Sequence, residues 1–284
     1  MKENDIYRAL QRHLDKQPVG FPATGSGEDI RLLKMHFTPE EAMVALAMGY
    51  RYETSDAIGE RLKSLFAPGE AGGIAESLSA LLETMSMKFT IMQRIEEGVA
   101  RYCLVPLVIG MYEGRVFDMD GEYIAAYDSY AHSMQHGLSF ISTDVPQMRT
   151  IPIEAAIPAE HAVMRFDDVR EHIKGTEGPI VIIECTCRKR KDIHGEPCRQ
   201  TERRETCMVF GDMAKQMLRF GKGREIHKAE ALDIMRLNQS EGLVLQTYNM
   251  QDPEVICSCC GCCCELLGIH RMLQQPQQEH ITSG

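Results

Sequence analysis

The strongest constraint on this chain is a run of six cysteines within eight residues, from 257 to 264. A hydrophobic core accepts an occasional cysteine as a small apolar side chain, but it does not accept six in one short segment. Four more lie upstream, so ten of the eleven cysteines fall in the last hundred residues. We predict that the two groups together line a site for a soft metal. The ten are Cys185, Cys187, Cys198, Cys207, Cys257, Cys259, Cys260, Cys262, Cys263 and Cys264.

A disulfide framework is the first alternative interpretation. Adjacent cysteines pair poorly, because a disulfide needs separated Cβ atoms that face each other. The first sixteen residues are charged and polar and contain no apolar stretch of the kind found in a secretory signal. We therefore expect a reducing, cytoplasmic compartment, where clustered cysteines indicate metal binding or catalysis.

Iron–sulfur clusters and zinc are the two candidate cofactors. Cys257, Cys260 and Cys263 are separated by two residues each, and Cys259 and Cys262 repeat that step, which is typical of bacterial iron–sulfur ligand runs. A structural zinc takes four ligands, whereas two four-iron clusters take eight of the ten thiolates. We therefore favour one or two 4Fe-4S clusters and keep zinc as the alternative, because the complete ferredoxin run ending in Cys-Pro is missing.

The ten cysteines are not equally favoured as cluster ligands. We favour a set of six, and the remaining four fill whatever positions are left open. The favoured six are Cys187, Cys198, Cys207, Cys257, Cys260 and Cys263, and the remaining four are Cys185, Cys259, Cys262 and Cys264.

Positive charge accompanies the upstream cysteines. From 185 to 225 the chain has eleven Lys and Arg residues against six Asp and Glu. Cations beside an anionic cluster raise its potential and lower thiol pKa values. A solvated basic face and a docking patch for an acidic electron-transfer partner are the two alternative explanations.

The length of 284 residues favours two domains. We predict an α+β chain with a winged-helix domain over 1–115, a helical linker region over 116–150 and a cysteine-rich iron–sulfur domain over 151–284. No apolar run approaches the length of a membrane span.

Helix signals followed by a hairpin predict the winged helix. Thr38 and Glu41 form a capping box, with Pro39 at the first helical position, and this helix should reach about Met48. The other predicted elements are a helix over 6–14, a helix over 57–66 capped at Thr54, chain breaks at Pro68-Gly69 and Gly72-Gly73, a helix over 74–85, and strands over 88–94 and 101–108.

The charge on this predicted domain argues against duplex DNA as a partner. DNA affinity rests on Lys and Arg placed against phosphates. The predicted third helix, 74–85, contains neither and carries Glu76 and Glu83. We expect it to pack instead against the metal domain or against a second subunit, as in a homo-oligomer.

Two histidines follow this domain. His132 and His136 are four residues apart and would share a helix face if one helix continued through both. No His-Glu-x-x-His pattern accompanies them, so we treat them as surface or interface residues. Tyr123, Tyr127 and Tyr130 have helical spacing, and prolines at 146 and 152 bracket the expected linker.

The C-terminal half alternates helix and strand signals. A buried strand over 179–184 should deliver Cys185 and Cys187, which point to opposite faces unless the strand has already ended. We also predict helices over 166–174, 207–220, 228–239 and 262–273 and a strand over 242–249, with Cys207 at a helix N-terminus that favours its thiolate.

These motifs resemble a group of cysteine-rich winged-helix proteins of anaerobic bacteria and archaea that are related to 4Fe-4S ferredoxins. The resemblance covers most of the chain and implies a winged-helix leader and a four-iron cofactor. Members often continue into a two-cluster ferredoxin module, which this sequence lacks. The matching segments are Pro18-Val-Gly-Phe-Pro-Ala-Thr24, Phe37-Thr-Pro-Glu-Glu41, Cys185-Thr-Cys-Arg-Lys, Gly195-Glu-Pro-Cys198, Cys207-Met-Val-Phe-Gly211, Gly242-Leu-Val and Ile256-Cys-Ser-Cys-Cys-Gly-Cys-Cys-Cys264.

Three functions follow from these observations. The leading hypothesis is electron transfer to or within a redox enzyme system, with a redox partner protein or an enzyme subunit as the partner. The second is an iron–sulfur enzyme or a reducing subunit that performs reductive or thiol–disulfide chemistry, because Cys259-Cys260-Gly261 resembles the CCG element of heterodisulfide reductases. The third is a redox-sensing regulator, which the acidic third helix disfavours.

Overall fold

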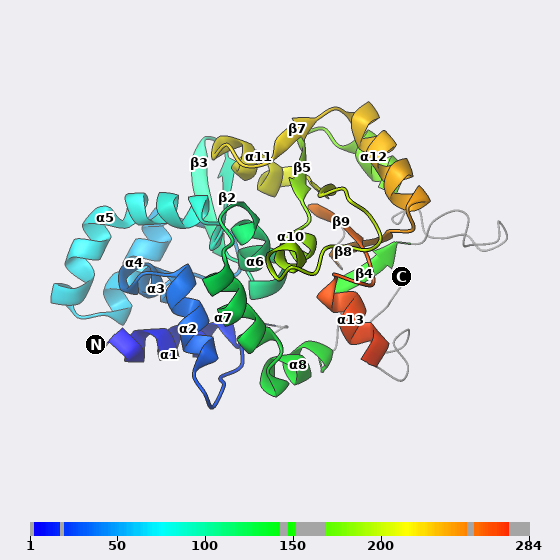
Figure 1. Cartoon of the computed structure of the whole chain (residues 1–284). Helices are drawn as coiled ribbons and strands as arrows, with labels where there is room; N and C mark the ends of the chain where they lie inside the picture. Colours follow the sequence, from blue (N-terminus) through cyan, green and yellow to red (C-terminus); the bar gives the residue numbers. More distant parts are fainter. Residues whose placement is uncertain (1–2, 18–19, 143–146, 152–168, 249–252, 273–284) are drawn as a thin grey trace. The chain divides into compact units, whose positions relative to one another are not determined.

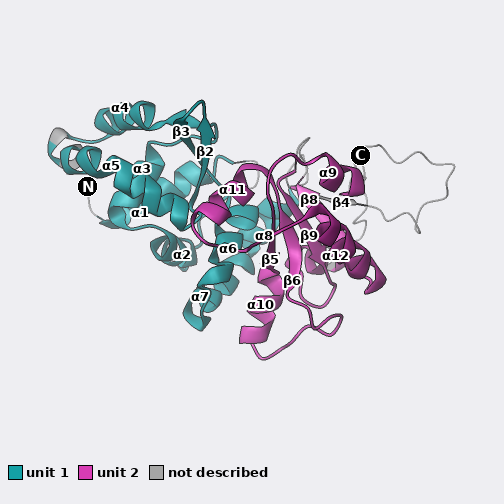
Figure 2. Cartoon of the chain, turned by 90° about the horizontal axis from the view of Figure 1, so that it is seen from above, with its two compact units in different colours: residues 1–143 teal, residues 144–284 magenta. Residues whose placement is uncertain are grey.

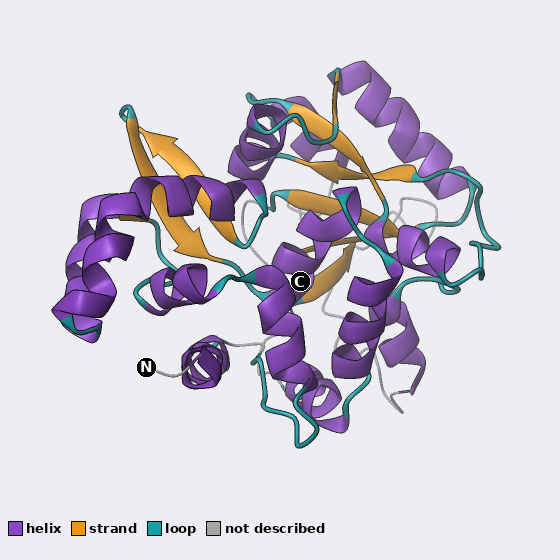
Figure 3. Cartoon of the chain, turned by 60° about the vertical axis from the view of Figure 1, so that its left-hand side comes forward, coloured by secondary structure: helices purple, strands orange, loops and turns teal. Residues whose placement is uncertain are grey.

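The protein is described by a computed structural model that covers residues 3–17, 20–142, 147–151, 169–248 and 253–272 (Figure 1). The chain divides into two compact units, Met1–Thr143 and Asp144–Gly284 (Figure 2). Each unit combines helices with one antiparallel sheet (Figure 3). This arrangement confirms the α+β class.

The N-terminal unit places its helices beside a three-stranded sheet of order β1-β3-β2. Its core consists of apolar residues from α1, α2, α3, α5 and α7. The elements are α1 Glu3–Leu14, α2 Glu28–His36, α3 Pro39–Leu46, β1 Glu53–Thr54, α4 Ser55–Leu65, α5 Pro68–Met87, β2 Ile91–Glu96, β3 Val99–Leu104, the π-turn η1 Leu107–Met111, α6 Tyr112–Gly114, the 3₁₀ turn η2 Arg115–Phe117, α7 Gly121–Ala131 and α8 Met134–Ile141.

Local signals in this unit act as predicted. The Thr38 side chain accepts the Glu41 amide, and the Glu41 carboxylate accepts the Thr38 amide, so the capping box at α3 is complete. The Thr54 side chain accepts the Ala57 amide and caps α4. The β2–β3 hairpin turns at Glu97 and Gly98, which both have positive φ, as tight primed turns require.

Helix α5 corrects one prediction of a chain break. It is a single helix of 20 residues that runs through Gly69, Gly72 and Gly73. Pro68 stands at its first turn, where a proline initiates a helix rather than ending it. Each internal glycine weakens a helix by only about 1 kcal/mol, which the packing of Ile74 and Leu82 can offset. Helix α2 was not predicted.

The two histidines do not share a helix face. Helix α7 ends at Ala131, and the side chain of Ser133 accepts the His136 amide and starts α8. His132 is therefore exposed at the junction, whereas His136 is buried against the ring of Tyr130. The three tyrosines predicted at helical spacing are all buried on α7.

The described elements of the N-terminal unit do not by themselves identify a winged helix. They provide helices and a β2–β3 hairpin, and β1 adds a third strand to the sheet. The winged-helix assignment stays a prediction.

The C-terminal unit is built on a six-stranded antiparallel sheet of order β4-β8-β9-β6-β5-β7. Helices α9 and α12 pack on one face of it (Figure 2), where Ile182, Met208 and Ile256 join Ile173 and Met235 in one apolar core. The elements are β4 Met148–Ile151, α9 Val169–Gly175, β5 Ile180–Glu184, α10 Thr186–Ile193, β6 Glu205–Val209, α11 Gly211–Arg219, β7 Arg224–Ile226, α12 Lys228–Ser240, β8 Val244–Tyr248, β9 Val255–Cys259 and α13 Glu265–Met272.

Several predictions for this unit need correction. Cys207 lies in the middle of β6 rather than at a helix start, because the apolar segment around it pairs with β5, and α11 begins only at Gly211. Residues 148–151 form strand β4 paired with β8, within the range predicted as linker. Helix α13 begins at Glu265, after the cysteine run, and Cys257 and Cys259 belong to β9. Residues 166–168 and both bracketing prolines lie outside the described residues.

The strands over 180–184 and 244–248 and helix α12 lie where the sequence predicted them. Strand β5 ends before Cys185, which occupies the N-cap of α10, so Cys187 lies on the first turn of that helix. In the parts of the chain that the structure describes, no helix combines the length and the apolar character needed to cross a membrane.

Candidate metal centre

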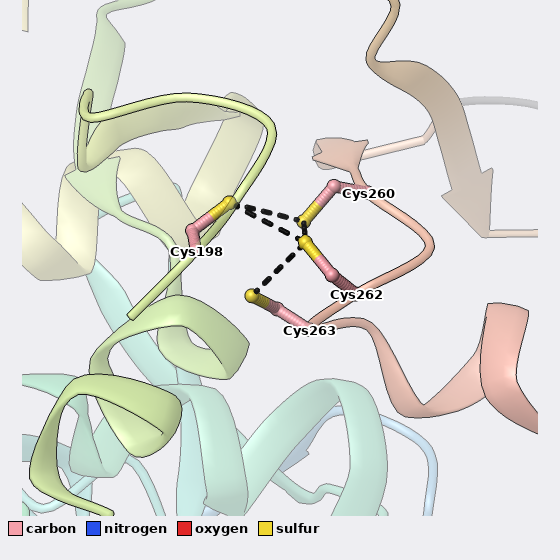
Figure 4. Close-up of side chains that lie close together, drawn as sticks. All are labelled: Cys198, Cys260, Cys262 and Cys263. Carbon is pink, nitrogen blue, oxygen red and sulfur yellow. Dashed lines mark hydrogen bonds between the residues drawn. The ribbon is translucent and has the colours of Figure 1, made fainter. Parts of the chain in front are cut away.

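Four cysteine side chains converge on one point in the C-terminal unit (Figure 4). We call Cys198, Cys260, Cys262 and Cys263 the four-thiol group, and their sulfur atoms all lie within 4.8 Å of one another. The Sγ of Cys198 is 3.6 Å from that of Cys260 and 3.7 Å from that of Cys262. The Sγ of Cys262 is 3.6 Å from that of Cys260 and 3.7 Å from that of Cys263. No two of these sulfurs are joined in a disulfide.

Two separate segments supply the four-thiol group. Cys198 lies on the loop between α10 and β6, and the other three lie on the tight turn that follows β9. The amides of Cys263 and Cys264 both donate to the carbonyl of Cys260, which folds this turn so that its side chains face the loop. Leu243 packs against Cys260 and Cys263 and closes the apolar side of the site.

Backbone amides act on the sulfur of Cys198. Burial raises the pKa of this thiol. Hydrogen bonds from the backbone amides of Thr201 and Gln200 and from the side chains of Cys260 and Arg188 outweigh burial and lower the pKa to about 6. Burial raises the pKa of Cys260 to about 11, although the positive charge of Arg188 opposes that change. The loop thus presents a thiolate at Cys198 beside Cys260, whose raised pKa keeps it a thiol.

The other six clustered cysteines, here called the six-thiol group, gather where strands β5, β6 and β9 meet helices α10 and α13. Met208 of β6 pairs with Ile256 of β9, so the antiparallel register places Cys207 opposite Cys257 on the same face of the sheet. Cys259 follows two residues later on that face. The group comprises Cys185, Cys187, Cys207, Cys257, Cys259 and Cys264.

Thiol–thiol hydrogen bonds link these six side chains in a closed series. The order is Cys185, Cys187, Cys264, Cys259, Cys257, Cys207 and back to Cys185. Bonds with Cys187 and Cys259 lower the pKa of Cys264 well below its usual value. The bond with Cys185 raises the pKa of Cys187 strongly, and the bond with Cys257 does the same for Cys259. Metal binding here would release protons, since thiolates rather than thiols are the ligands.

A fully buried arginine lies between the two groups. The side chain of Arg188, on α10, is 0% exposed and donates from Nη1 to the Thr206 hydroxyl at 2.6 Å and from Nη2 to the Ser258 carbonyl at 2.9 Å. Burial lowers its pKa, but the charges of thiols from both groups, Cys185 first and then Cys260, more than reverse this. Among the described residues, Arg188 makes no ion pair with a carboxylate. The negative charges that raise its pKa include those of thiols from both groups.

Four other basic side chains near the site are already paired. Lys189 binds Glu184, Arg203 binds Glu241 and Arg204 binds Asp192. Arg190 is buried and pairs with Glu265 at the start of α13. These pairs argue against a freely solvated basic face. They also argue against a patch that awaits an acidic partner. The excess positive charge in the sequence mostly balances local carboxylates.

The structure brings all ten predicted cysteines together within one unit, but it divides them differently from the sequence prediction. The upstream and downstream groups meet, as predicted, through the contacts of Cys198 with Cys260 and Cys262. Cys262, placed in the second rank, completes the four-thiol group. Cys187, Cys207 and Cys257, from the favoured set, belong to the six-thiol group, and Cys103 lies apart, buried in β3 of the N-terminal unit.

Sequence reasoning missed the polar side chains that hold the two groups in place. Thr206 and Ser258 bind Arg188, and Asn238 of α12 donates to the Ser258 hydroxyl at 2.7 Å and to the Thr206 carbonyl at 3.2 Å. Gln246 receives the thiol of Cys264 at 3.9 Å. The sequence signal that could have found these side chains is a small polar residue next to a cysteine in a mostly apolar strand, as in Glu-Thr-Cys-Met-Val and Val-Ile-Cys-Ser-Cys.

The chain matches no protein-family model, no curated protein and no solved structure. The functional assignment therefore rests on the chemistry of the site. Cys198, Cys260, Cys262 and Cys263, none of which is joined in a disulfide, form a group that can hold a metal ion.

Proposed function

We propose that this chain is an iron–sulfur protein that transfers electrons, with one or two 4Fe-4S clusters or related centres held by the cysteines of the C-terminal unit. The observation that carries the proposal is that four separate segments bring ten thiols into the C-terminal unit, of which Cys185, Cys198, Cys207 and Cys260 act on the buried Arg188. A closed structural zinc site needs only four ligands, so zinc alone leaves most of these thiols without a role.

The surroundings of the thiols support electron transfer. A redox centre needs stable ligands, an environment that sets its potential and shielding from solvent. The thiols supply the ligands, the buried charge of Arg188 favours the reduced, more negative state of a cluster, and Leu243 adds apolar cover. Arg188, Thr206 and Gln246 contact thiols, and none of these three is a ready general acid or base at neutral pH.

The resemblance to winged-helix proteins related to 4Fe-4S ferredoxins is part of this proposal. In this reading the N-terminal unit is a winged helix that contacts a protein rather than duplex DNA. Helix α5, which corresponds to the recognition helix, contains no Lys or Arg. A redox partner protein or an enzyme subunit would then receive or supply the electrons.

The test is the metal content of protein purified without oxygen. We expect brown protein with about four to eight iron atoms per chain and a comparable amount of acid-labile sulfide. Dithionite should bleach the visible absorption reversibly, as a centre that accepts electrons requires. Colourless protein that contains zinc and no sulfide would overturn the proposal.

A second function is favoured by the number of thiols in the six-thiol group. One 4Fe-4S cluster uses four cysteines, so two of the six would remain as thiols beside the cluster. Such a pair could reduce a disulfide by exchange, forming its own disulfide and receiving two electrons back through the cluster. Counting reactive thiols in the metal-loaded, reduced protein tests this: two per chain beyond Cys103 support the enzyme, and none supports simple electron transfer.

A further inference from the structure

The distances within the four-thiol group point to an ion of a particular kind. A tetrahedral ion with metal–sulfur bonds of about 2.3 Å holds its four sulfurs about 3.8 Å apart. Four of the six sulfur–sulfur distances are 3.6 Å or 3.7 Å, close to that edge, and all six are within 4.8 Å. In a four-iron cube each thiolate binds a different iron at a different corner, so the four sulfurs must stand much further apart. The four-thiol group therefore has the size of a single-ion site.

The six-thiol group has a wider arrangement. Its members lie on strands β6 and β9, at the start of helix α10 and just before helix α13, and Cys207 and Cys257 are neighbours on two paired strands. Among the described residues, no three of its sulfurs come as close together as those of the four-thiol group, all within 4.8 Å. A wider ring of thiols fits a centre with several metal ions.

The order of cysteines along the run supports this division. Cys257 and Cys259 belong to the six-thiol group, the next three cysteines belong to the four-thiol group, and Cys264 returns to the six-thiol group. The tight turn closed by the carbonyl of Cys260 produces this alternation. One short segment thus supplies ligands to two places, with Arg188 between them.

We propose that the C-terminal unit holds two centres of unequal size. A single tetrahedral divalent ion, zinc or ferrous iron, is bound by Cys198, Cys260, Cys262 and Cys263. The polynuclear iron–sulfur cluster is bound within the six-thiol group. This inference rests on the proposed iron–sulfur function for its second half and on the sulfur–sulfur distances alone for its first half.

Paired cysteine variants of the full chain test the division. In Cys262→Ser, the protein should lose one metal equivalent per chain and keep all of its acid-labile sulfide. In Cys259→Ser, it should lose most of its sulfide together with the associated iron and keep one metal equivalent. The matched control is Cys103→Ser, whose side chain is buried in the N-terminal unit, and it should change neither quantity.

Each other outcome has a defined meaning. Equal loss of sulfide in both variants, or unchanged metal in Cys262→Ser, would overturn the division into two centres. Wild-type protein without sulfide would overturn the proposed function and the cluster half of this inference. Loss of one sulfur-ligated ion in Cys262→Ser would still support the single-ion site in that case.

A measurement on wild-type protein guards against variants that fail to fold. If the single ion is zinc, X-ray absorption at the zinc edge should show four sulfur neighbours at about 2.3 Å and no second metal nearby. If the ion is iron, the Mössbauer spectrum of ⁵⁷Fe-labelled protein should contain a separate high-spin tetrathiolate component. A spectrum in which every metal has a close metal neighbour would overturn the single-ion site.

Discussion

The two units of this protein bury different kinds of side chain. The N-terminal unit buries leucines, isoleucines and a row of tyrosines, as at Leu10, Leu33, Leu82 and Tyr127. The C-terminal unit has a smaller apolar core. Beside that core it buries six of its ten clustered cysteines and the charged side chain of Arg188. Burial of apolar surface can stabilise the first unit without a cofactor. A buried cation costs free energy unless negative charge compensates it, and the charges of thiols from both cysteine groups do so at Arg188.

Metal removal should separate the two units most strongly. We expect chelation under reducing conditions to unfold much of the C-terminal unit, because metal binding to thiolates contributes on the order of 10 kcal/mol to the folding of small thiolate sites. Hydrogen exchange of the full chain should then show lost protection in β6 and β9 and unchanged protection in α3 and α7. Equal loss of protection in both units would break the comparison.

The second-largest effect concerns Arg188 in the metal-loaded protein. There, Arg188→Met should reduce the free energy of unfolding of the C-terminal unit by about 3–5 kcal/mol, because buried negative charge loses its partner.

Denaturation curves of the metal-loaded protein measure this loss. The control is Arg236→Met, an exposed residue on α12 that pairs with Asp233, and it should have little effect. An unchanged free energy of unfolding in Arg188→Met would show that the charge of Arg188 does not stabilise the thiolates.

A core substitution in the N-terminal unit should sharpen the comparison from the other side. Leu82 is 0% exposed, and Leu82→Ala should cost about 2–5 kcal/mol through lost burial and a residual cavity. Metal content should not change. Leu65→Ala, at a residue that is 53% exposed, is the matched control and should cost much less. Loss of metal in Leu82→Ala would mean that the two units fold as one.

The smallest effect is a pH dependence that belongs to the N-terminal unit. Burial, aided by the nearby charges of Arg115 and Lys88, lowers the pKa of His36 to about 3. Below about pH 6.5 the unfolded chain therefore binds a proton at His36, whereas the folded unit does not. The free energy of unfolding should fall by roughly 1.4 kcal/mol per pH unit as the pH drops from about 6.5 towards 3.

The variant His36→Gln should remove this slope between pH 6 and pH 5, measured as the difference in unfolding free energy from wild type. The Tyr123 hydroxyl and His36 Nε2 are hydrogen-bonded at 3.2 Å, so the substitution will also lower the free energy of unfolding at neutral pH. An unchanged slope in the variant would assign the pH dependence to other groups.

Much of the fold could be predicted where local chemistry decides it. The capping box at Thr38, the cap at Thr54 and the apolar strand over 180–184 each depend on a few neighbouring residues, and each lies where expected. The helix predicted at Cys207 was wrong because pairing of β6 with β5 overrides a helix signal that is only local. The break at Gly72 was wrong for the opposite reason, since helix packing tolerates glycines that look like breakers.

Part of the candidate site was predictable from the sequence. Density of cysteines alone singled out ten residues, and four of them form the group that can hold a metal ion. The division into four and six depends on the turn at Cys260 and on the register between β6 and β9, which bring distant segments together. Spacing along the chain did not show that Cys262 joins Cys198, Cys260 and Cys263, and nothing in the sequence distinguishes buried Arg188 from the neighbouring Lys189 on α10.

The loop that carries Cys198 has a consequence for the lifetime of the protein in a cell. Between α10 and β6 the chain has no regular structure over 195–204, and its attachments include hydrogen bonds from Gln200 and Arg203 to Glu241. A newly made chain that has not received metal lacks the link from Cys198 to the turn at Cys260, so this loop should open often. Proteases cut in proportion to the population of open forms. Degradation should therefore begin in this loop, and the abundance of the protein should follow the supply of metal.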